Sequence, residues 1–112
     1  MSSSKGVNMQ YVEIELTQGN INNDHLYLSS ITEFFPSDSF GGSNSQDIAP
    51  VLLEVHCGIN EPVVTDIAGD KNIFRKRSWV KEFFKTHNMT AGDKVIIEHT
   101  GRHRYHVYPK RS

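Results

Sequence analysis

The side chains best suited to reading nucleic acid lie in residues 66–79. This segment carries turn formers, carboxylates, Asn72 and the basic triplet Arg75-Lys76-Arg77. The fork of an arginine matches the two acceptors of a guanine edge, asparagine matches adenine, and a carboxylate accepts from cytosine. Because side chains alternate along a strand, we expect Arg75 and Arg77 on one face as base readers and Lys76 on the other as a phosphate contact.

A second segment, residues 20–25, is dense in amide, carboxylate and imidazole groups. These groups can also contact base edges. The same composition fits an ordinary polar turn, because asparagine and aspartate are turn formers, so both interpretations stay open for this segment alone. Its candidate base readers are Asn20, Asn22, Asn23, Asp24 and His25.

Patterns for catalysis and metal binding are weak. His99, His103 and His106 lie close in sequence and could in principle bind zinc, but His103 and His106 would face opposite sides of a strand. Cys57 is the single cysteine, so a cysteine pair cannot complete a structural site. No nuclease-type carboxylate–lysine motif, phosphate loop or nucleophile elbow occurs. The sequence therefore predicts a chain with no catalytic activity of its own, no cofactor and no metal.

Charge is distributed unevenly along the chain, although the net charge is only −1. Residues 1–70 hold one basic and ten acidic side chains, whereas residues 71–112 hold eleven basic and three acidic ones. Such asymmetry suggests a polyanionic partner for the basic half. The alternative is that the two halves neutralise each other within the fold.

The length of 112 residues favours one domain. We expect this domain to cover residues 9–109, with a flexible N-terminus over residues 1–8 and a tail over residues 110–112. A single cysteine excludes an intramolecular disulfide and weakly favours a reducing compartment. Because no signal peptide and no apolar run of membrane-spanning length is present, we expect a cytoplasmic protein of bacterial type without membrane association.

Short apolar runs separated by turn signals predict a mainly β fold with about seven strands and two short helices. Evenly spaced strands of this kind are typical of a small barrel or sandwich. Residues 17–24 and 37–45 are expected to be loops, the latter with left-handed backbone at Gly41-Gly42. The expected strands cover residues 11–16, 25–28, 51–57, 62–67, 71–75, 94–98 and 104–108.

Both expected helices have recognisable start or stop signals. Residues 30–33 fit a capping box for a short helix that Pro36 would end. Ser78 is the expected cap of a helix over residues 79–87, where apolar residues recur at the i, i+3, i+4, i+7 spacing of one helix face. This second helix would follow directly after the basic triplet and position it.

Several short motifs carry a resemblance through their order and spacing. They are Leu26-Tyr27-Leu28, Phe34-Phe35-Pro36, Phe74-Arg75, Arg77, Trp79-Val80, Phe83-Phe84 and Ala91-Gly92-Asp93-Lys94-Val95. Together they resemble the B-three-like DNA-binding pseudobarrel over residues 11–109. The pattern is closer to the effector or target-recognition domains of restriction endonucleases, such as EcoRII and BfiI, than to the plant transcription factors that share the fold.

The resemblance implies an open seven-stranded pseudobarrel with two short helices that grips the DNA major groove with two arms. Residues 20–27 would form the first arm and residues 66–77 the second, which Phe74 and Trp79 would hold to the core. Loops beside the arms would contact phosphates, with Gly42, Ser43, Asn44, Lys81 and Arg104 as candidates. Independently of the resemblance, Lys85 on the expected second helix is a further cation that could contact phosphate. The expected DNA-binding residues are Asn20, Asn22, Asn23, Asp24, His25, Tyr27, Ser43, Asn44, Asp66, Asp70, Lys71, Asn72, Arg75, Lys76, Arg77, Lys81 and Arg104.

The expected function is therefore sequence-specific binding of double-stranded DNA, as the specificity or effector domain of a restriction endonuclease. A catalytic nuclease domain in the full-length protein would be its partner. One alternative is a small barrel that binds single-stranded nucleic acid or another ligand, with Tyr27, Tyr105 and Tyr108 as stacking candidates. A metal-dependent hydrolase built on the histidine cluster is the less favoured alternative.

Overall fold

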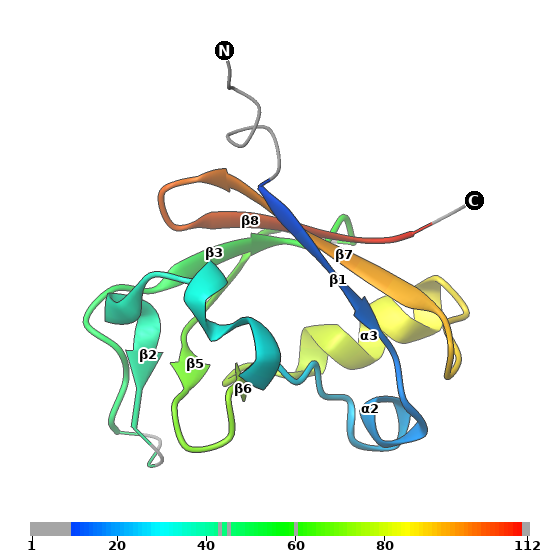
Figure 1. The fold of residues 1–112 in the computed structure, drawn as a ribbon, viewed down its shortest axis with the longest axis horizontal. Helices are drawn as coiled ribbons and strands as arrows, with labels where there is room; N and C mark the ends of the chain where they lie inside the picture. Colours follow the sequence, from blue (N-terminus) through cyan, green and yellow to red (C-terminus); the bar gives the residue numbers. More distant parts are fainter. Residues whose placement is uncertain (1–9, 43, 45, 60, 111–112) are drawn as a thin grey trace.

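Two open β-sheets form the framework of the protein in a computed structural model that describes residues 10–42, 44, 46–59 and 61–110 (Figure 1). The expectations for residues 1–8, for Ser43 and for the last two tail residues lie outside the described residues. The strands are β1 (Tyr11–Glu15), β2 (Phe40–Gly41), β3 (Leu53–His56), β4 (Val63–Thr65), β5 (Ile67–Ala68), β6 (Ile73–Phe74), β7 (Lys94–Gly101) and β8 (Arg104–Pro109). The helices are α2 (Gln18–Asn23), η1 (Ser29–Phe34), η2 (Ser37–Ser39) and α3 (Ser78–Thr86), of which η1 and η2 are 3₁₀ helices.

The larger sheet has the order β1-β7-β8-β3-β4 and the smaller one the order β2-β5-β6. Both are mixed, because β3 pairs with β8 and β2 with β5 in parallel, while the other pairs are antiparallel. The mainly β fold with two α-helices is confirmed in this coarse sense. Of the two helices expected, α3 is an α-helix and the one over residues 30–35 is the 3₁₀ helix η1, whereas α2 lies where a loop was expected. The sheets do not close into a barrel, and the described part of the chain holds eight strands rather than seven.

Two strands were not expected and one expected strand is missing. Strand β2 and the 3₁₀ helix η2 lie in residues 37–45, which were expected to be a loop. Strand β5 arises where the chain passes from one sheet to the other. Residues 62–67 were expected to form one strand, but the ladder breaks at Asp66, whose side chain is buried at 2% exposure. Residues 25–28 contribute only a single bridge, between Tyr27 and Ile73, instead of a full strand. Leu26 and Leu28 are nevertheless buried, as the alternation predicts.

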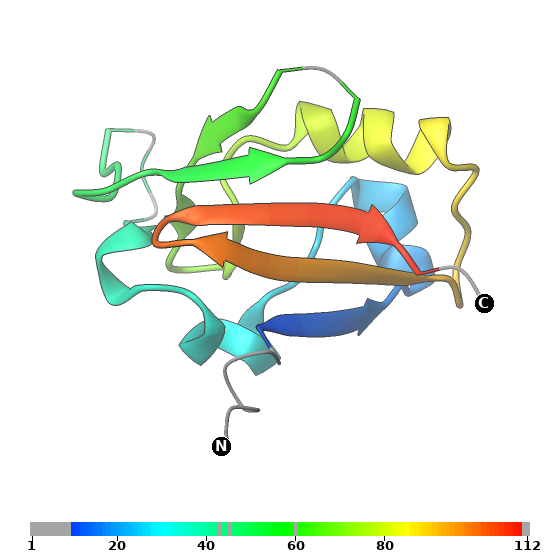
Figure 2. The same cartoon turned by 90° about the horizontal axis from the view of Figure 1, so that it is seen from above.

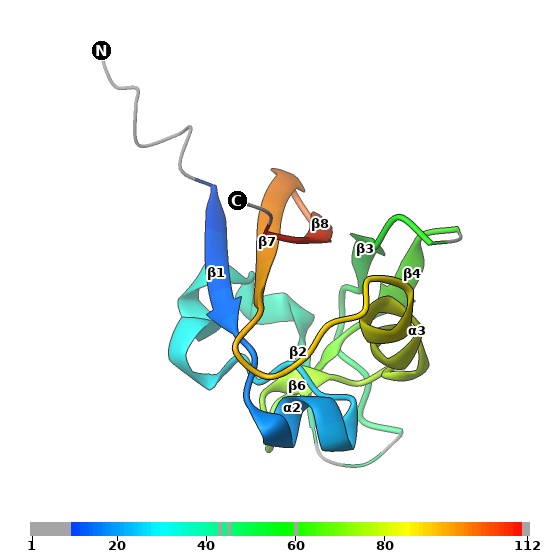
Figure 3. The ribbon, with the colours of Figure 1, turned by 90° about the vertical axis from the view of Figure 1, so that its right-hand side faces the viewer.

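One hydrophobic core lies beneath the five-stranded sheet, whose outer face is uncovered in the views from above and from the side (Figures 2 and 3). Tyr105, Phe74 and Phe83 are among its largest fully buried side chains. The hydroxyl of Tyr105 donates to the carbonyl of Phe34 at 3.1 Å, and burial raises the pKa of Tyr105 to about 12. Tyr105 is therefore a core residue and not a stacking platform for bases.

Helix α3 buries the face that the apolar spacing predicts. Trp79, Val80 and Phe83 are among its buried residues, and the rings of Trp79 and Phe74 meet edge to face at 5.5 Å. These contacts confirm that Phe74 and Trp79 hold the second arm to the core. The helix begins one residue earlier than expected, so Arg77 and not Ser78 occupies the N-cap position.

Two further local expectations, concerning residues 17–24 and 30–33, are wrong. Residues 17–24 form helix α2 and not a loop, because the Thr17 hydroxyl accepts from the Asn20 N–H while the Asn20 side chain accepts from the Thr17 N–H, a capping box. Helix η1 begins after Leu28 without a side-chain cap, although Pro36 follows it closely as expected. No helix in the part of the chain that the structure describes has both the length and the apolar character of a membrane span.

Candidate nucleic-acid interface

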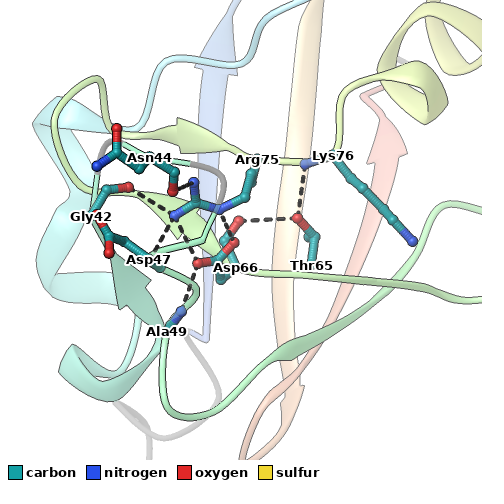
Figure 4. A network of polar contacts seen from close by, with 8 residues as sticks. All are labelled: Gly42, Asn44, Asp47, Ala49, Thr65, Asp66, Arg75 and Lys76. Carbon is teal, nitrogen blue, oxygen red and sulfur yellow. Dashed lines mark hydrogen bonds and ion pairs between the residues drawn. The ribbon is translucent and has the colours of Figure 1, made fainter.

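Arg75, expected to read bases, is instead held inside a polar network (Figure 4). Its Nε and Nη2 atoms donate to the two carboxylate oxygens of Asp66 at 2.6 and 3.0 Å. The same guanidinium donates to the carbonyls of Asn44, Gly42 and Asp47 at 3.0, 2.8 and 3.2 Å. Arg75 therefore fastens the loop over residues 42–47 to the start of the second arm.

The charges of Asp66 and Arg75 stabilise each other within this network. Burial alone would raise the pKa of Asp66, but hydrogen bonds from Arg75 and from the Ala49 N–H, together with the guanidinium charge, hold it below its usual value. The pKa of Arg75 is raised by its bond to Asp66. Asp66 and Arg75 therefore have structural partners for their polar atoms, namely each other, the Ala49 N–H and three loop carbonyls. Their expected contact with DNA stays a prediction.

Gly41 is required here for close approach rather than for left-handed backbone. A Cβ on Gly41 would lie 2.3 Å from the Asp47 carbonyl oxygen, 2.5 Å from an Asp66 carboxylate oxygen and 2.6 Å from Arg75 Nη2. The described glycines with positive φ are Gly58 and Gly92, so the left-handed backbone expected at residues 41–42 is not observed. The glycine pair allows the loop to reach the guanidinium.

Arg77 lies on a different segment from Arg75. Strand β6 ends at Phe74, and Arg77 has φ −119° and ψ −12°, so the strand alternation that would pair the two arginines does not apply. The Arg77 guanidinium instead contacts Nε2 of His25, and Nδ1 of His25 lies 3.3 Å from the hydroxyl of Tyr27. The expectation that Arg75 and Arg77 share a face is therefore wrong.

The two expected arms meet at their bases. The N–H of Leu28 donates to the Asn72 carbonyl at 2.8 Å, next to the Tyr27–Ile73 bridge. Burial and the nearby charges of Arg77 and Lys71 lower the pKa of His25, against the effect of Asp24. Because a guanidinium can only donate, Nε2 of His25 accepts from Arg77 in this contact.

A row of cations runs from the arm junction along α3. Arg77, Lys81 and Lys85 recur every four residues, so they share one helix face. Lys81 and Lys85 line a groove of ≈410 Å³ together with Ile21 and Asp24 at the end of α2. We name the surface formed by Lys71, Arg77, Lys81, Lys85 and His25 the basic edge. None of its four cations forms an ion pair with a carboxylate of the described residues.

The remaining expected residues of the first arm fall into two groups. Asn20 is 2% exposed, and its side chain also donates to the His25 carbonyl at 3.1 Å, so it stabilises the arm from within and is not a base reader. Asn22 and Asn23 are exposed on α2, where each makes a hydrogen bond to a residue one turn earlier. Tyr27 is 42% exposed.

The second arm keeps an exposed tip. Asp70 and Lys71 are exposed in the turn between β5 and β6, and Asn72 follows in left-handed backbone with φ 55°. Lys76 is exposed beyond this turn, while its N–H donates to the Thr65 hydroxyl at 3.0 Å. Asn44 is exposed and contributes its carbonyl to the Arg75 network.

Arg104 lies apart from the basic edge. It begins β8 after the β7–β8 turn, which Figure 1 shows at the upper left, whereas α2 lies at the lower right. Arg104 is 3.7 Å from the carboxylate of Glu54. It therefore belongs to the charged outer face of the large sheet.

The clustered histidines have separate surroundings. His99 stacks on Tyr105 at 4.7 Å, His103 lies 3.0 Å from Asp38, and His106 stacks on His56 at 4.7 Å. No group of three or more histidine, cysteine, aspartate or glutamate residues is placed to hold a metal ion, as far as the described residues go.

Chemically, the basic edge can bind phosphates and the adjoining turn and helix end can offer hydrogen bonds to bases. Sequence reasoning had selected both segments, but it missed the structural roles of Asn20 and Arg75. The Thr17-x-x-Asn20 spacing was a usable signal for the first, because it matches the positions of a capping box. Comparison of the chain with models of protein families, with curated proteins and with solved structures found no match.

Proposed function

We propose that this chain binds double-stranded DNA sequence-specifically through the major groove, with the basic edge as its contact surface. The observation that supports this most is the gathering of four exposed cations around the end of α2. Lys71 and Arg77 lie near His25, and Lys81 and Lys85 line a groove with Asp24. Outside this surface, Lys110 pairs with Glu13 at 3.0 Å and Arg104 lies 3.7 Å from the Glu54 carboxylate.

Phosphate binding falls to the cations of α3. Lys81 and Lys85 are exposed and one turn apart, so they can follow the phosphates of one strand. A lysine that neutralises one phosphate releases about one counterion, which makes the affinity depend on salt. These contacts position the domain and carry no sequence information themselves.

The side chains that contact base edges would be those at the surface of the two arms. On the first arm Asn23 is exposed and Asp24 and His25 are half-buried, and Asp70 and Lys71 form the exposed tip of the second arm. These groups offer donors and acceptors that match base edges in the major groove. Arg77, held by His25 at the junction, is the arginine that remains able to reach a guanine after Arg75 is committed to Asp66.

The proposal takes the two open sheets as a form of the B-three-like pseudobarrel. In this reading the chain is the specificity or effector domain of a restriction endonuclease and has no catalytic activity of its own. A nuclease domain in the full-length protein would cut the DNA that this domain recognises. Fold resemblance alone does not assign a function, so the binding site has to be tested directly.

Selection from a random duplex pool, followed by gel-shift titration of the selected and a scrambled duplex, tests the proposal. We expect the wild-type chain to prefer the selected duplex, and Arg77→Ala to lose about 1–3 kcal/mol of that preference. Arg102→Ala, which removes an exposed cation in the β7–β8 turn, is the matched control and should change neither titration. Selection without any enriched sequence, or equal loss in both variants, would contradict the proposal.

A further inference from the structure

One buried side-chain donor has no hydrogen-bond partner in the part of the chain that the structure describes, the indole N–H of Trp79. The Trp79 side chain is buried, with 6% exposure of the residue. Buried donors are nearly always hydrogen-bonded, and leaving one unpaired is destabilising. Trp79 also lines a hollow of ≈210 Å³ between the residues after β3 and the start of α3, so an acceptor bound there could satisfy its N–H.

The hollow has an apolar wall and an acidic rim. Ile59 and Val63 are half-buried against the core, and Cys57 beside them is buried. At the rim, Glu61 and Glu82 are exposed, and neither carboxylate forms a hydrogen bond or an ion pair with a described residue. The described lining residues include no lysine, arginine or histidine. The charge at this hollow is therefore negative and uncompensated.

These groups together restrict the chemistry of a ligand. An indole N–H only donates, so it requires an acceptor atom. Two unpaired carboxylates attract a cation and repel an anion, so the acceptor has to be neutral and the ligand positively charged. A purely apolar ligand would leave the Trp79 N–H without a partner. A carbonyl oxygen joined to an ammonium group through a short apolar chain meets all of these conditions.

We propose that the hollow binds a primary alkylammonium cation that carries a carbonyl oxygen. The carbonyl accepts from the indole N–H of Trp79, the alkyl chain packs on Ile59 and Val63, and the ammonium lies beside Glu61 and Glu82. At about 30 Å³ for each water, the hollow has room for about seven waters, which suits a chain of about six carbons. A free amino amide and a lysine residue of an extended peptide share this chemistry.

Titration with 6-aminohexanamide, a free amino amide, tests the proposal. Trp79 is the single tryptophan, so its indole N–H gives one signal in a ¹H–¹⁵N NMR spectrum. We expect this signal to move as the N–H gains an acceptor, with a Kd on the order of 1 mM for so small a ligand. Hexanamide, which lacks the ammonium, should bind about tenfold more weakly, because it loses the attraction of both carboxylates. Hexylammonium, which lacks the carbonyl, should move the indole signal little.

Variants of the rim test the two carboxylates. Glu82→Gln should weaken 6-aminohexanamide about threefold, and the double variant Glu61→Gln/Glu82→Gln about tenfold, because each exposed carboxylate contributes modestly through water. Glu15→Gln is the matched control, since it removes an exposed carboxylate on β1, at the opposite edge of the large sheet from β4, and should keep the wild-type affinity.

A blocked Gly-Lys-Gly tripeptide distinguishes the two sources of this chemistry. If the tripeptide moves the indole signal and binds more tightly than 6-aminohexanamide, the ligand is a lysine residue of a protein partner. If the tripeptide binds more weakly than the amino amide, the ligand is a free small molecule. Both results support an alkylammonium site at this hollow.

Three results would overturn the proposal. They are an indole signal that stays in place throughout the titration, hexanamide that binds as tightly as 6-aminohexanamide, and a double variant with wild-type affinity. The first of these would mean that water serves the Trp79 N–H. The proposed duplex binding is independent of this site, because Lys81 and Lys85 line a separate groove, so it stands or falls by its own test.

Discussion

Replacing Arg75 by alanine should destabilise the fold more than any other change in the basic triplet. Five hydrogen bonds of the guanidinium would be lost, two of them to Asp66. The Asp66 carboxylate would stay buried, with the backbone N–H groups of Ala49, at 2.8 Å, and of Asp66 itself still donating to it. An uncompensated buried charge is the main cost of such a change.

The magnitude follows from the burial of the two partners. Breaking a buried ion pair by removing one partner costs about 3–5 kcal/mol. The Arg75 side chain keeps 19% exposure while Asp66 keeps 2%, so we expect the lower end of this range, about 3 kcal/mol. For a domain of this size, that loss lowers Tm by roughly 10 °C.

Urea unfolding followed by the fluorescence of Trp79, the single tryptophan, measures this loss. Trp79 is 6% exposed and packs on Phe74, so its emission reports on the core beside the network. Lys76→Ala is the matched control, because the neighbouring side chain is exposed and should contribute within about 0.5 kcal/mol.

The pH dependence gives the same reasoning a second test. In the wild-type chain the lowered pKa of Asp66 contributes stability above its unfolded value, and this contribution is lost as the pH falls through the folded pKa, below about pH 4. In the Arg75→Ala variant the Asp66 carboxylate is buried without a cation, and burial then raises its pKa. Protonation of Asp66 removes the unpaired buried charge and so stabilises the variant. The difference in the free energy of unfolding between the wild-type chain and Arg75→Ala should therefore become smaller at acidic pH. A loss below about 0.5 kcal/mol at pH 7, or a difference that widens at acidic pH, would refute the buried pair.

The remaining predictions concern the elements that hold the two arms. Asn20→Ala should cost about 1–2 kcal/mol in urea unfolding, because it removes the capping box and the bond to the His25 carbonyl, whereas Asn22→Ala on the exposed side should cost less than 0.5 kcal/mol. Gly41→Ala should lower Tm measurably, because its Cβ would approach the Asp47 carbonyl oxygen within 2.3 Å; an unchanged Tm would show that the loop relaxes freely. Arg77→Ala should leave the free energy of unfolding nearly unchanged while it reduces duplex preference, and a large loss of stability would contradict its assignment to the surface.

Strongly periodic segments could be predicted from the sequence. The alternation of Val12 and Ile14 predicted β1, and the spacing of Val80, Phe83 and Phe84 predicted α3. Both could be predicted because the side chains that share a buried face recur at a fixed spacing in the sequence. Helix α2 was missed because its residues favour turns when taken one by one. Its formation depends on reciprocal hydrogen bonds between Thr17 and Asn20.

The candidate site was predictable in part, for a physical reason. Residues 20–25 and 66–79 were selected by their composition, and the resemblance set the arm bounds at 20–27 and 66–77. The structure brings the two segments together at Leu28 and Asn72. The role of Arg75 was not predictable, because its carbonyl partners lie 28–33 residues earlier in the chain. The position of Arg77 was not predictable either. The triplet was expected to continue the strand, but β6 ends at Phe74, and the change in backbone conformation after it places Arg77 against His25.

The salt dependence of duplex affinity tests the central claim most directly. The logarithm of the binding constant is measured against the logarithm of salt concentration for the wild-type chain and for the double variant Lys81→Ala/Lys85→Ala. If the basic edge holds the phosphates, the double variant binds selected and scrambled duplexes more weakly alike, and its slope is smaller by about two. A wild-type chain that binds no duplex, or a double variant with an unchanged slope, would contradict the account.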